Sequence, residues 1–172
     1  MNVIARTTQA RTPIDAGTFQ RVMGSFPAGV AVVTTRDADL RPCGLTTTAL
    51  ASVSLDPPLL LVCVDLASRT LPALLHARTF AVNVLEVGHS SLARHFASKV
   101  DDKFAELAWT DGASGLPILR EHCVAWAECQ LRTELEAGDH VILIGEVVDG
   151  WAAQDGQSLI YFQRGFGRFA AL

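Results

Sequence analysis

Hydrophobic residues along this chain fall mainly into short, dense runs with the length and composition of β-strands. The run at residues 59–64 contains no polar side chain apart from a cysteine thiol, which is typical of a strand covered on both faces. We expect strands at Val30–Thr35, Cys43–Val53, Leu59–Val64, Thr79–Leu85, His122–Leu135, His140–Ala152 and Ser158–Gly165.

Apolar residues recur at helical spacing in three places, which predicts three short helices. Asp15 is suited to cap the first, which ends before Pro27. The second begins at about Ser68 or Thr70, and the third spans Ser90–Ser98. Their apolar faces are formed by Phe19, Val22, Met23 and Phe26; by Leu71, Leu74 and Leu75; and by Leu92 and Phe96.

The order of these elements indicates a mainly β protein. Consecutive strands are joined by short turns, such as residues 136–139, and strands and helices do not alternate regularly. This pattern favours a closed antiparallel barrel over a parallel nucleotide-binding sheet. With 172 residues, 49% of them hydrophobic, we expect a loose arm at residues 1–14 and a single domain at residues 15–172.

Charge and hydropathy exclude several classes of partner. The formal net charge is -4 and no run of lysine or arginine occurs, so we expect no nucleic acid partner. The longest aliphatic run is too short to cross a bilayer, and the polar first residues lack the apolar core of a secretion signal. We therefore expect a soluble cytoplasmic protein without membrane contact.

Metal and redox motifs are absent from the sequence. The four cysteines show no CxxC spacing, so they are expected to be buried free thiols, and the histidines show no metal-ligand spacing. Residues 165–170 fit the GxGxxG/A pattern of a dinucleotide-binding turn, but that pattern needs a following helix. Since the sequence stops at Leu172, we do not expect a Rossmann fold.

A series of segments resembles the short-chain flavin reductases. The segments are FPAGV, VAVVTT, GLTTTALASVSLDPPLLLVCVD, FAVNVL, HFAS with DKF, GDHVILIGEV and YFQRGFGRF, and the resemblance runs from about Phe19 to Phe169. Members of this family are FMN-binding split β-barrels, antiparallel and of Greek-key topology, with a few short flanking helices. They are the reductase components of two-component flavin-dependent monooxygenases.

The resemblance implies an NAD(P)H:flavin oxidoreductase. Such an enzyme transfers hydride from NADH or NADPH to FMN or FAD and supplies reduced flavin to a partner monooxygenase. It also implies a homodimer with flavin sites at or near the subunit boundary. Two alternatives stay open: an electron-carrier module that holds FMN without direct NAD(P)H turnover, and a small-ligand barrel that has lost flavin.

The resemblance places the flavin ring along the threonine-rich segment. Flavin is a flat apolar plate with a polar rim, which suits a strand that carries hydroxyl groups. Threonine is also a favoured strand residue, so these side chains could simply fill a strand. The residues implied are Thr46, Thr47, Thr48 and Ala49, with Ser52 and Val53 close by.

A phosphate site is expected where the next segment opens a helix. Unpaired N–H groups and the helix dipole at such a position favour an anion, so Ser68, Arg69 and Thr70 are candidates. Helix capping by Ser68 and Thr70 is an alternative that does not exclude this role. Relatives often carry Asn at the position of Asp65, and its carboxylate would repel a phosphate unless it points away.

The resemblance implies three further groups of site residues. His140 is expected near the nicotinamide or the flavin and is the candidate catalytic residue, although a histidine at this strand edge could be purely structural. The second contact with the flavin tail is implied for Ser98, Lys103 and Phe104, and closure over the site for Tyr161, Arg164 and Phe166.

Overall fold

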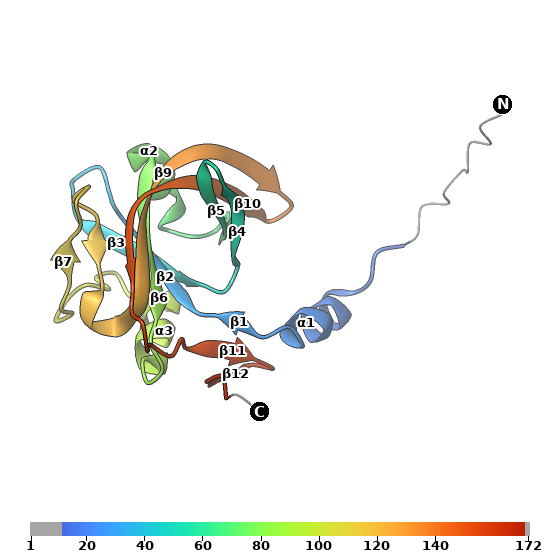
Figure 1. The fold of residues 1–172 in the computed structure, drawn as a ribbon. Coiled ribbons are helices and arrows are strands. Elements are labelled where there is room, and N and C mark those ends of the chain that lie inside the picture. Colours follow the sequence, from blue (N-terminus) through green and yellow to red (C-terminus); the bar gives the residue numbers. More distant parts are fainter. Residues whose placement is uncertain (1–11, 171–172) are drawn as a thin grey trace.

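The computed structural model describes residues 12–170, which form a curled antiparallel sheet with short helices at its rim (Figure 1). The helices are α1 (Ala16–Gly24), α2 (Leu71–Ala77), α3 (Ser90–Ala97) and the 3-10 turn η1 (Arg120–His122). The strands are β1 (Ala28–Gly29), β2 (Ala31–Arg36), β3 (Pro42–Thr47), β4 (Leu50–Leu55), β5 (Pro58–Asp65), β6 (Thr79–Leu85), β7 (Thr110–Asp111), β8 (Pro117–Ile118), β9 (Cys123–Ala137), β10 (His140–Ala152), β11 (Ile160–Phe162) and β12 (Gly165–Gly167).

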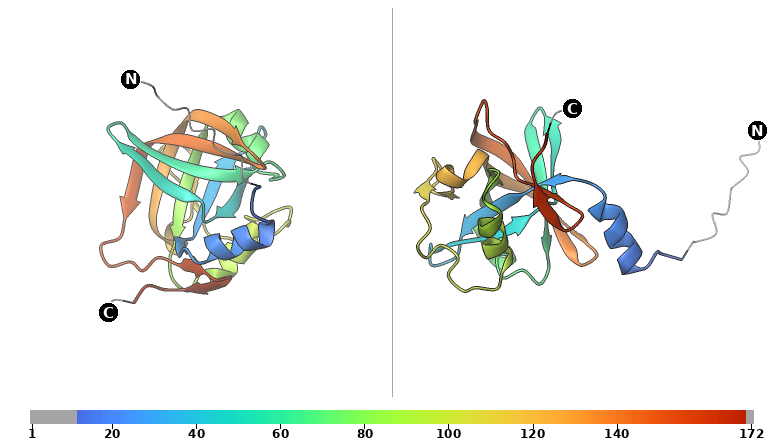
Figure 2. Two further views of the ribbon diagram at one scale, coloured as in Figure 1. Left: turned by 90° about the vertical axis from the view of Figure 1, so that its right-hand side faces the viewer. Right: turned by 90° about the horizontal axis from the view of Figure 1, so that it is seen from below.

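Seven strands form the main sheet in the order β3-β2-β6-β9-β10-β5-β4, and every pairing is antiparallel. Figure 2 shows these strands wrapped around a common interior. The two edge strands, β3 and β4, follow each other in the chain but do not pair. Ala49 lies in the short connection between them, and its carbonyl accepts a hydrogen bond of 3.0 Å from the Cys63 N–H of β5. Because β3 and β4 do not pair, the barrel is split between them, as the resemblance implied, and is not the closed barrel that the order of elements favoured.

The barrel interior is filled by alternating strand residues. Phe80 on β6 and Leu143 on β10 are fully buried there. Gly145 lies beside the Phe80 ring, where an added Cβ would approach the ring Cζ to 2.6 Å. A register shift in the β9–β10 pairing falls at the same position, between Ile144 and Gly145. Gly145 therefore leaves the space that the Phe80 ring occupies.

Three strand predictions need correction. The single strand expected over Cys43–Val53 is two strands, because Thr47 Oγ1 accepts the Ala49 N–H at 3.0 Å and turns the chain out of β3. The strand at residues 59–64 is fully buried only at Val62 and Val64, while its other face lines a cavity. The last strand is a short hairpin, β11–β12, and the described residues continue into no helix after it.

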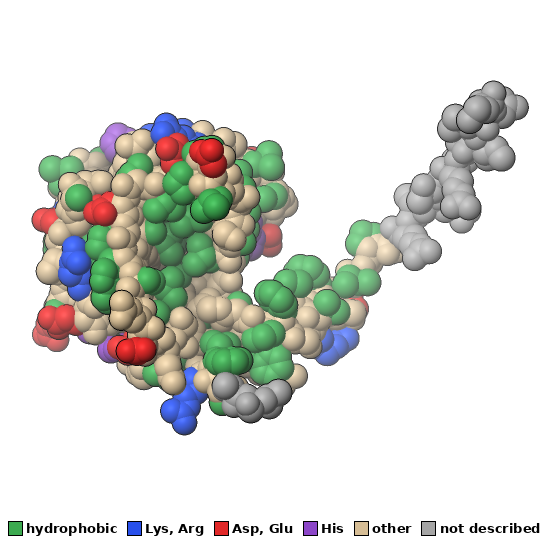
Figure 3. All heavy atoms as spheres, viewed as in Figure 1, with side chains coloured by type: hydrophobic (Ala, Val, Ile, Leu, Met, Phe, Trp, Pro, Cys, Tyr) green, Lys and Arg blue, Asp and Glu red, His purple; other side chains and the backbone are tan. Residues whose placement is uncertain are grey.

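Helix α1 forms as predicted, with the Asp15 carboxylate accepting the Thr18 N–H at 2.9 Å. Its apolar residues, however, are largely exposed: Phe19 is 55% exposed and Val22 is 59% exposed. Hydrophobic side chains along α1 face a hollow in the barrel surface (Figure 3). This helix thus presents an apolar surface that no described residue covers.

The remaining expectations concern thiols, metals and membranes. Cys123 and Cys129 are buried free thiols, but Cys43 and Cys63 are only partly buried. Among residues 12–170, no group of ligating side chains has the arrangement of a metal site. None of the described helices is long and apolar enough to span a membrane. The arm predicted at residues 1–14 lies mostly outside the described residues.

Candidate flavin-binding site

A cavity of about 640 Å³ lies between the end of β3 and the loops that precede α2 and follow α3. We call it the polar cavity. Its volume lies within the range of small-molecule and cofactor sites, roughly 300–1,000 Å³. It is lined by Leu45, Thr46, Thr47, Thr48, Ala49, Cys63, Asp65, Ala67, Ser68, Arg69, Thr70, Phe96, Ala97, Ser98, Lys99, Lys103 and His140.

The three consecutive threonines differ in what their hydroxyls do. Thr46 Oγ1 donates to the Ala93 carbonyl at 2.7 Å and thereby ties β3 to α3. Thr47 Oγ1 accepts from the Ala49 N–H and holds the turn. Among the described hydrogen bonds, none involves the hydroxyl of Thr48, which is exposed and lines the cavity. The hydroxyl available to a ligand is therefore that of Thr48.

Strand β3 also offers backbone groups. It is an edge strand that pairs only with β2, so its outer N–H and C=O groups have no strand partner. A planar ligand with hydrogen-bonding groups on one rim could meet them, because edge groups point along the plane of the sheet. This strand supplies the side of the cavity that suits such a ring.

Most backbone donors of the loop before α2 already have partners, whereas the prediction expected unpaired N–H groups there. Helix α2 begins at Leu71 and has seven residues, too short for a strong dipole, and most N–H groups of the preceding loop are already paired, although no described hydrogen bond uses the Arg69 N–H. The Ala67 N–H donates to the Asp65 carboxylate at 2.7 Å, and Thr70 N–H donates to Ser68 Oγ at 3.3 Å. The Thr70 hydroxyl donates to the Gly44 carbonyl at 3.1 Å and supports β3.

Positive charge at one end of the polar cavity comes from Arg69 and Lys103. Lys103 Nζ donates to the carbonyls of Phe96 at 2.6 Å and Gly44 at 3.1 Å, which fixes its position. Burial lowers the pKa of the Lys103 ammonium, and the nearby charge of Arg69 lowers this pKa further. Two cations that repel each other form a site that an anion stabilises.

His140 lies at the start of β10, where it pairs with Asp65 of β5. Its Nδ1 is 2.7 Å from the carboxylate of Asp139, and this hydrogen bond lowers the pKa of Asp139. The contact fixes the orientation of the ring and leaves Nε2 without a partner among the described residues. The ring is partly exposed and reaches the polar cavity.

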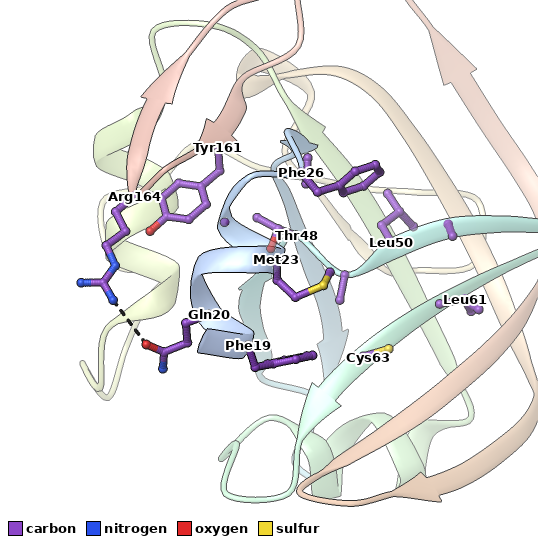
Figure 4. A pocket seen from close by; sticks show the side chains of 14 residues that line it. Phe19, Gln20, Met23, Phe26, Thr48, Leu50, Leu61, Cys63, Tyr161 and Arg164 are labelled. Atoms are coloured by element: carbon purple, nitrogen blue, oxygen red, sulfur yellow. Dashed lines mark hydrogen bonds between the residues drawn. The ribbon is translucent and has the colours of Figure 1, made fainter. Parts of the chain in front are cut away.

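A second cavity of about 600 Å³ shares Thr48, Ala49 and Cys63 with the polar cavity and extends to α1. We call it the apolar cavity. Figure 4 shows Phe19 and Met23 of α1 on one side of it and Leu50 and Leu61 of the barrel on the other. Tyr161 and Arg164 close one end, and Arg164 donates to Gln20 at 3.3 Å.

The structure brings most of the predicted site residues together, but not all of them. Ten line the polar cavity, and Tyr161 and Arg164 line the apolar cavity. Phe166 lies nearby, stacked under the Arg94 guanidinium at 4.8 Å. Ser52 and Val53 are exposed on β4, and Phe104 is buried against Phe96, so these three line neither cavity.

The sequence analysis missed several residues that line the polar cavity, and two of them, Lys99 and Cys63, have side chains that can ionise. Lys99 lines it directly after Ser98, a position that the charge pattern alone could have suggested. Cys63 lies between the two cavities, and burial raises the pKa of its thiol, so that it forms a neutral part of the wall. Because residues 59–64 show no alternation of polar and apolar side chains, the sequence did not indicate which face of the strand carries Cys63.

The fold and the site together define a split-barrel protein with room for a flat ring and a cationic end for an anionic tail. A family profile described as "Flavin reductase like domain" matches residues 23–170. The chain therefore belongs to the flavin reductase-like family.

Individual relatives agree with this assignment. A protein named flavin reductase (NADH) from Kitasatospora aureofaciens is 47% identical over 158 residues, covering 91% of this chain and 83% of the relative. The reductase component of a 4-nitrophenol 4-monooxygenase/4-nitrocatechol 2-monooxygenase from Rhodococcus opacus is 38% identical, covering 91% and 83%. The solved structure of a Streptomyces globisporus NADH:FAD oxidoreductase, in complex with NAD and FAD fragments, aligns with a TM-score of 0.86 at 37% identity, covering 95% and 98%.

Replacing Thr48 with valine is expected to weaken binding of riboflavin, FMN and FAD alike. The loss should be about 1–3 kcal/mol, the cost of a buried polar group of the ligand that has lost its partner. Quenching of flavin fluorescence measures the three dissociation constants. Thr133→Val, an exposed β9 change away from both cavities, is the matched control. Unchanged dissociation constants for Thr48→Val would show that this hydroxyl does not meet the flavin.

Proposed function

We propose that this protein is an NAD(P)H:flavin oxidoreductase that binds FMN or FAD in the polar cavity and accepts NADH or NADPH as the electron donor. The proposal rests on one observation: the same cavity combines the outer edge of β3, followed by the unbonded hydroxyl of Thr48, with a cationic end at Arg69 and Lys103. These features fit the polar rim and the phosphate of a flavin nucleotide. Membership of the flavin reductase-like family agrees with this choice.

The work of the protein in this reaction is orientation. A bound flavin supplies the hydride-accepting chemistry, so no protein nucleophile is required. The β3 edge and Thr48 would hold the polar rim of the ring, and donors at this rim stabilise the negative charge of a reduced flavin. Arg69, Lys103 and Ser68 would hold the phosphate, while His140 would orient the nicotinamide next to the ring.

We further propose that a second copy of the chain covers α1 and that reduced flavin passes to a monooxygenase. The first proposal is supported by the exposed apolar side chains of α1 and the turn after it, among them Phe26 at 68% exposure, which water solvates poorly. A mass in solution of twice 18.4 kDa would agree with it. The second is supported by the Rhodococcus opacus relative, which is named as a reductase component. The cytoplasmic location expected from the sequence stays a prediction.

A test of the activity uses purified protein with NADH or NADPH and an excess of free FMN or FAD under anaerobic conditions. Catalytic bleaching of the yellow flavin absorbance is the expected result. A bound flavin that neither nucleotide reduces would instead indicate an electron carrier. Absence of any flavin binding would indicate a small-ligand barrel.

His140→Ala is expected to lower kcat/KM for the reduced nicotinamide nucleotide by about two- to tenfold, the value of one hydrogen bond. The dissociation constant for flavin should change less than about twofold, because the ring and phosphate contacts lie on other elements. Steady-state kinetics at saturating flavin and a separate flavin titration distinguish the two effects. His76→Ala, a change on α2 away from both cavities, is the control. Parent-like constants for NADH and NADPH in His140→Ala would remove this histidine from the site.

A further inference from the structure

The guanidinium of Arg69 is engaged by an acidic residue of its own chain. Its Nη1 donates to the Asp101 carboxylate at 2.6 Å, and its Nη2 donates to the carbonyls of Val100, at 3.1 Å, and Lys99. These partners lie on the loop after α3, across the cavity mouth from the loop that carries Arg69. The only charged partner in this set is Asp101.

The Arg69–Asp101 pair is easily replaced. The Asp101 side chain is 95% exposed and that of Arg69 is 57% exposed, so water screens their attraction and solvates the carboxylate well if it is released. A flavin phosphate carries more charge than a carboxylate and offers three acceptor oxygens. The phosphate would also contact Lys103, whereas Asp101 forms no described hydrogen bond with Lys103.

We infer that Asp101 competes with the flavin phosphate for Arg69 and so keeps flavin binding weak enough for exchange. The inference rests on the proposed function, because it concerns the same cavity. In the ligand-free protein Arg69 pairs with Asp101, and on binding the phosphate takes the place of the carboxylate. Asp101 is thus a residue that sets affinity, not a catalytic residue. A reductase that passes reduced flavin to another protein must release it, and this competition lowers the cost of release.

The test compares FMN with riboflavin, which has the same ring but no phosphate. Asp101→Asn removes the competing charge and should lower the FMN dissociation constant by about two- to fivefold, as expected for an exposed ion pair. Its FMN dissociation rate should fall by a similar factor in stopped-flow fluorescence. Riboflavin affinity should be unchanged.

A double mutant separates competition for Arg69 from a general effect of charge. In an Arg69→Met background, Asp101→Asn should have no effect on FMN binding if the two groups act through each other. Tighter FMN binding in that background would overturn the inference, since it would show that the charge of Asp101 acts on the phosphate directly and not through Arg69. Unchanged or weaker FMN binding by Asp101→Asn alone would overturn it too. Failure of the parent protein to bind even riboflavin would instead overturn the proposed function, and this inference with it.

Discussion

Replacing Lys103 with methionine is expected to raise the FMN dissociation constant by about 10- to 150-fold. Hydrogen bonds to charged groups contribute about 1.5–3 kcal/mol, and Lys103 Nζ is held at the cationic end of the polar cavity by the Phe96 and Gly44 carbonyls. Burial, and after it the charge of Arg69, lowers the pKa of Lys103, and a phosphate there would relieve the repulsion between the two cations. Methionine keeps much of the apolar stem and removes the charge.

Two controls make this result specific. Riboflavin binding should change less than about threefold, because the ring contacts at Thr46–Ala49 are untouched; a large loss would mean that the cavity itself had collapsed. Lys99→Met removes the other lysine at the cavity, which donates in no described side-chain hydrogen bond. An equal loss of FMN affinity in Lys99→Met, with little loss in Lys103→Met, would move the phosphate site toward the end of α3.

Phe80→Ala is expected to lower the free energy of unfolding by about 3–5 kcal/mol, the usual cost of deleting a buried phenylalanine ring. Phe80 is fully buried in the barrel interior, where it packs against the backbone of Gly145. A loss of this size is a large share of the stability of a typical domain, roughly 5–15 kcal/mol. Urea denaturation followed by circular dichroism measures it.

Gly145→Ala provides the matching test, because its new methyl group would meet the Phe80 ring. Alone it should destabilise the protein by about 1–3 kcal/mol through overpacking. Combined with Phe80→Ala, it should cost less than in the parent, since the ring is gone and the Cys129 Cβ, at 2.9 Å from the added methyl group, is what still crowds it. Strict additivity of the two losses would contradict the contact that the structure describes.

Much of the local structure follows from residues close together in the chain. Asp15 caps α1 through Thr18, three residues away, and the apolar spacing of α3 is that of a helix packed on one face. The long strands β9 and β10, with a short turn at Gly138, also appear where the apolar runs predict them. Such features depend on neighbours in sequence, so a single chain reveals them.

The roles of the three consecutive threonines could not be predicted from neighbouring residues. Thr46, Thr47 and Thr48 are the same residue type in one run, and the sequence offers no reason to distinguish them. Their different roles come from partners distant in sequence or from the turn itself: Ala93 for Thr46 and Ala49 for Thr47. Strand propensity also predicted one strand here, whereas the chain leaves one edge of the sheet and joins the other.

The partners of the charged residues at the expected phosphate site could not be predicted from the sequence either. Arg69 could be recognised as a cation near a helix start, but not as the partner of Asp101, which lies 32 residues later. Likewise, Lys103 could be read as surface charge, whereas its ammonium is partly buried between two backbone carbonyls.

By itself, the amino-acid sequence determined the antiparallel strands, the short helices, the family and most of the residues around the polar cavity. Only the tertiary structure decided which threonine hydroxyl is free, that the loop before α2 has already used most of its backbone donors, and that Arg69 is paired with a carboxylate. The physical reason is that each hydrogen-bonding or charged group can engage only a few partners. Whether a polar group can serve a ligand depends on whether a segment distant in the chain has already taken its bonding capacity.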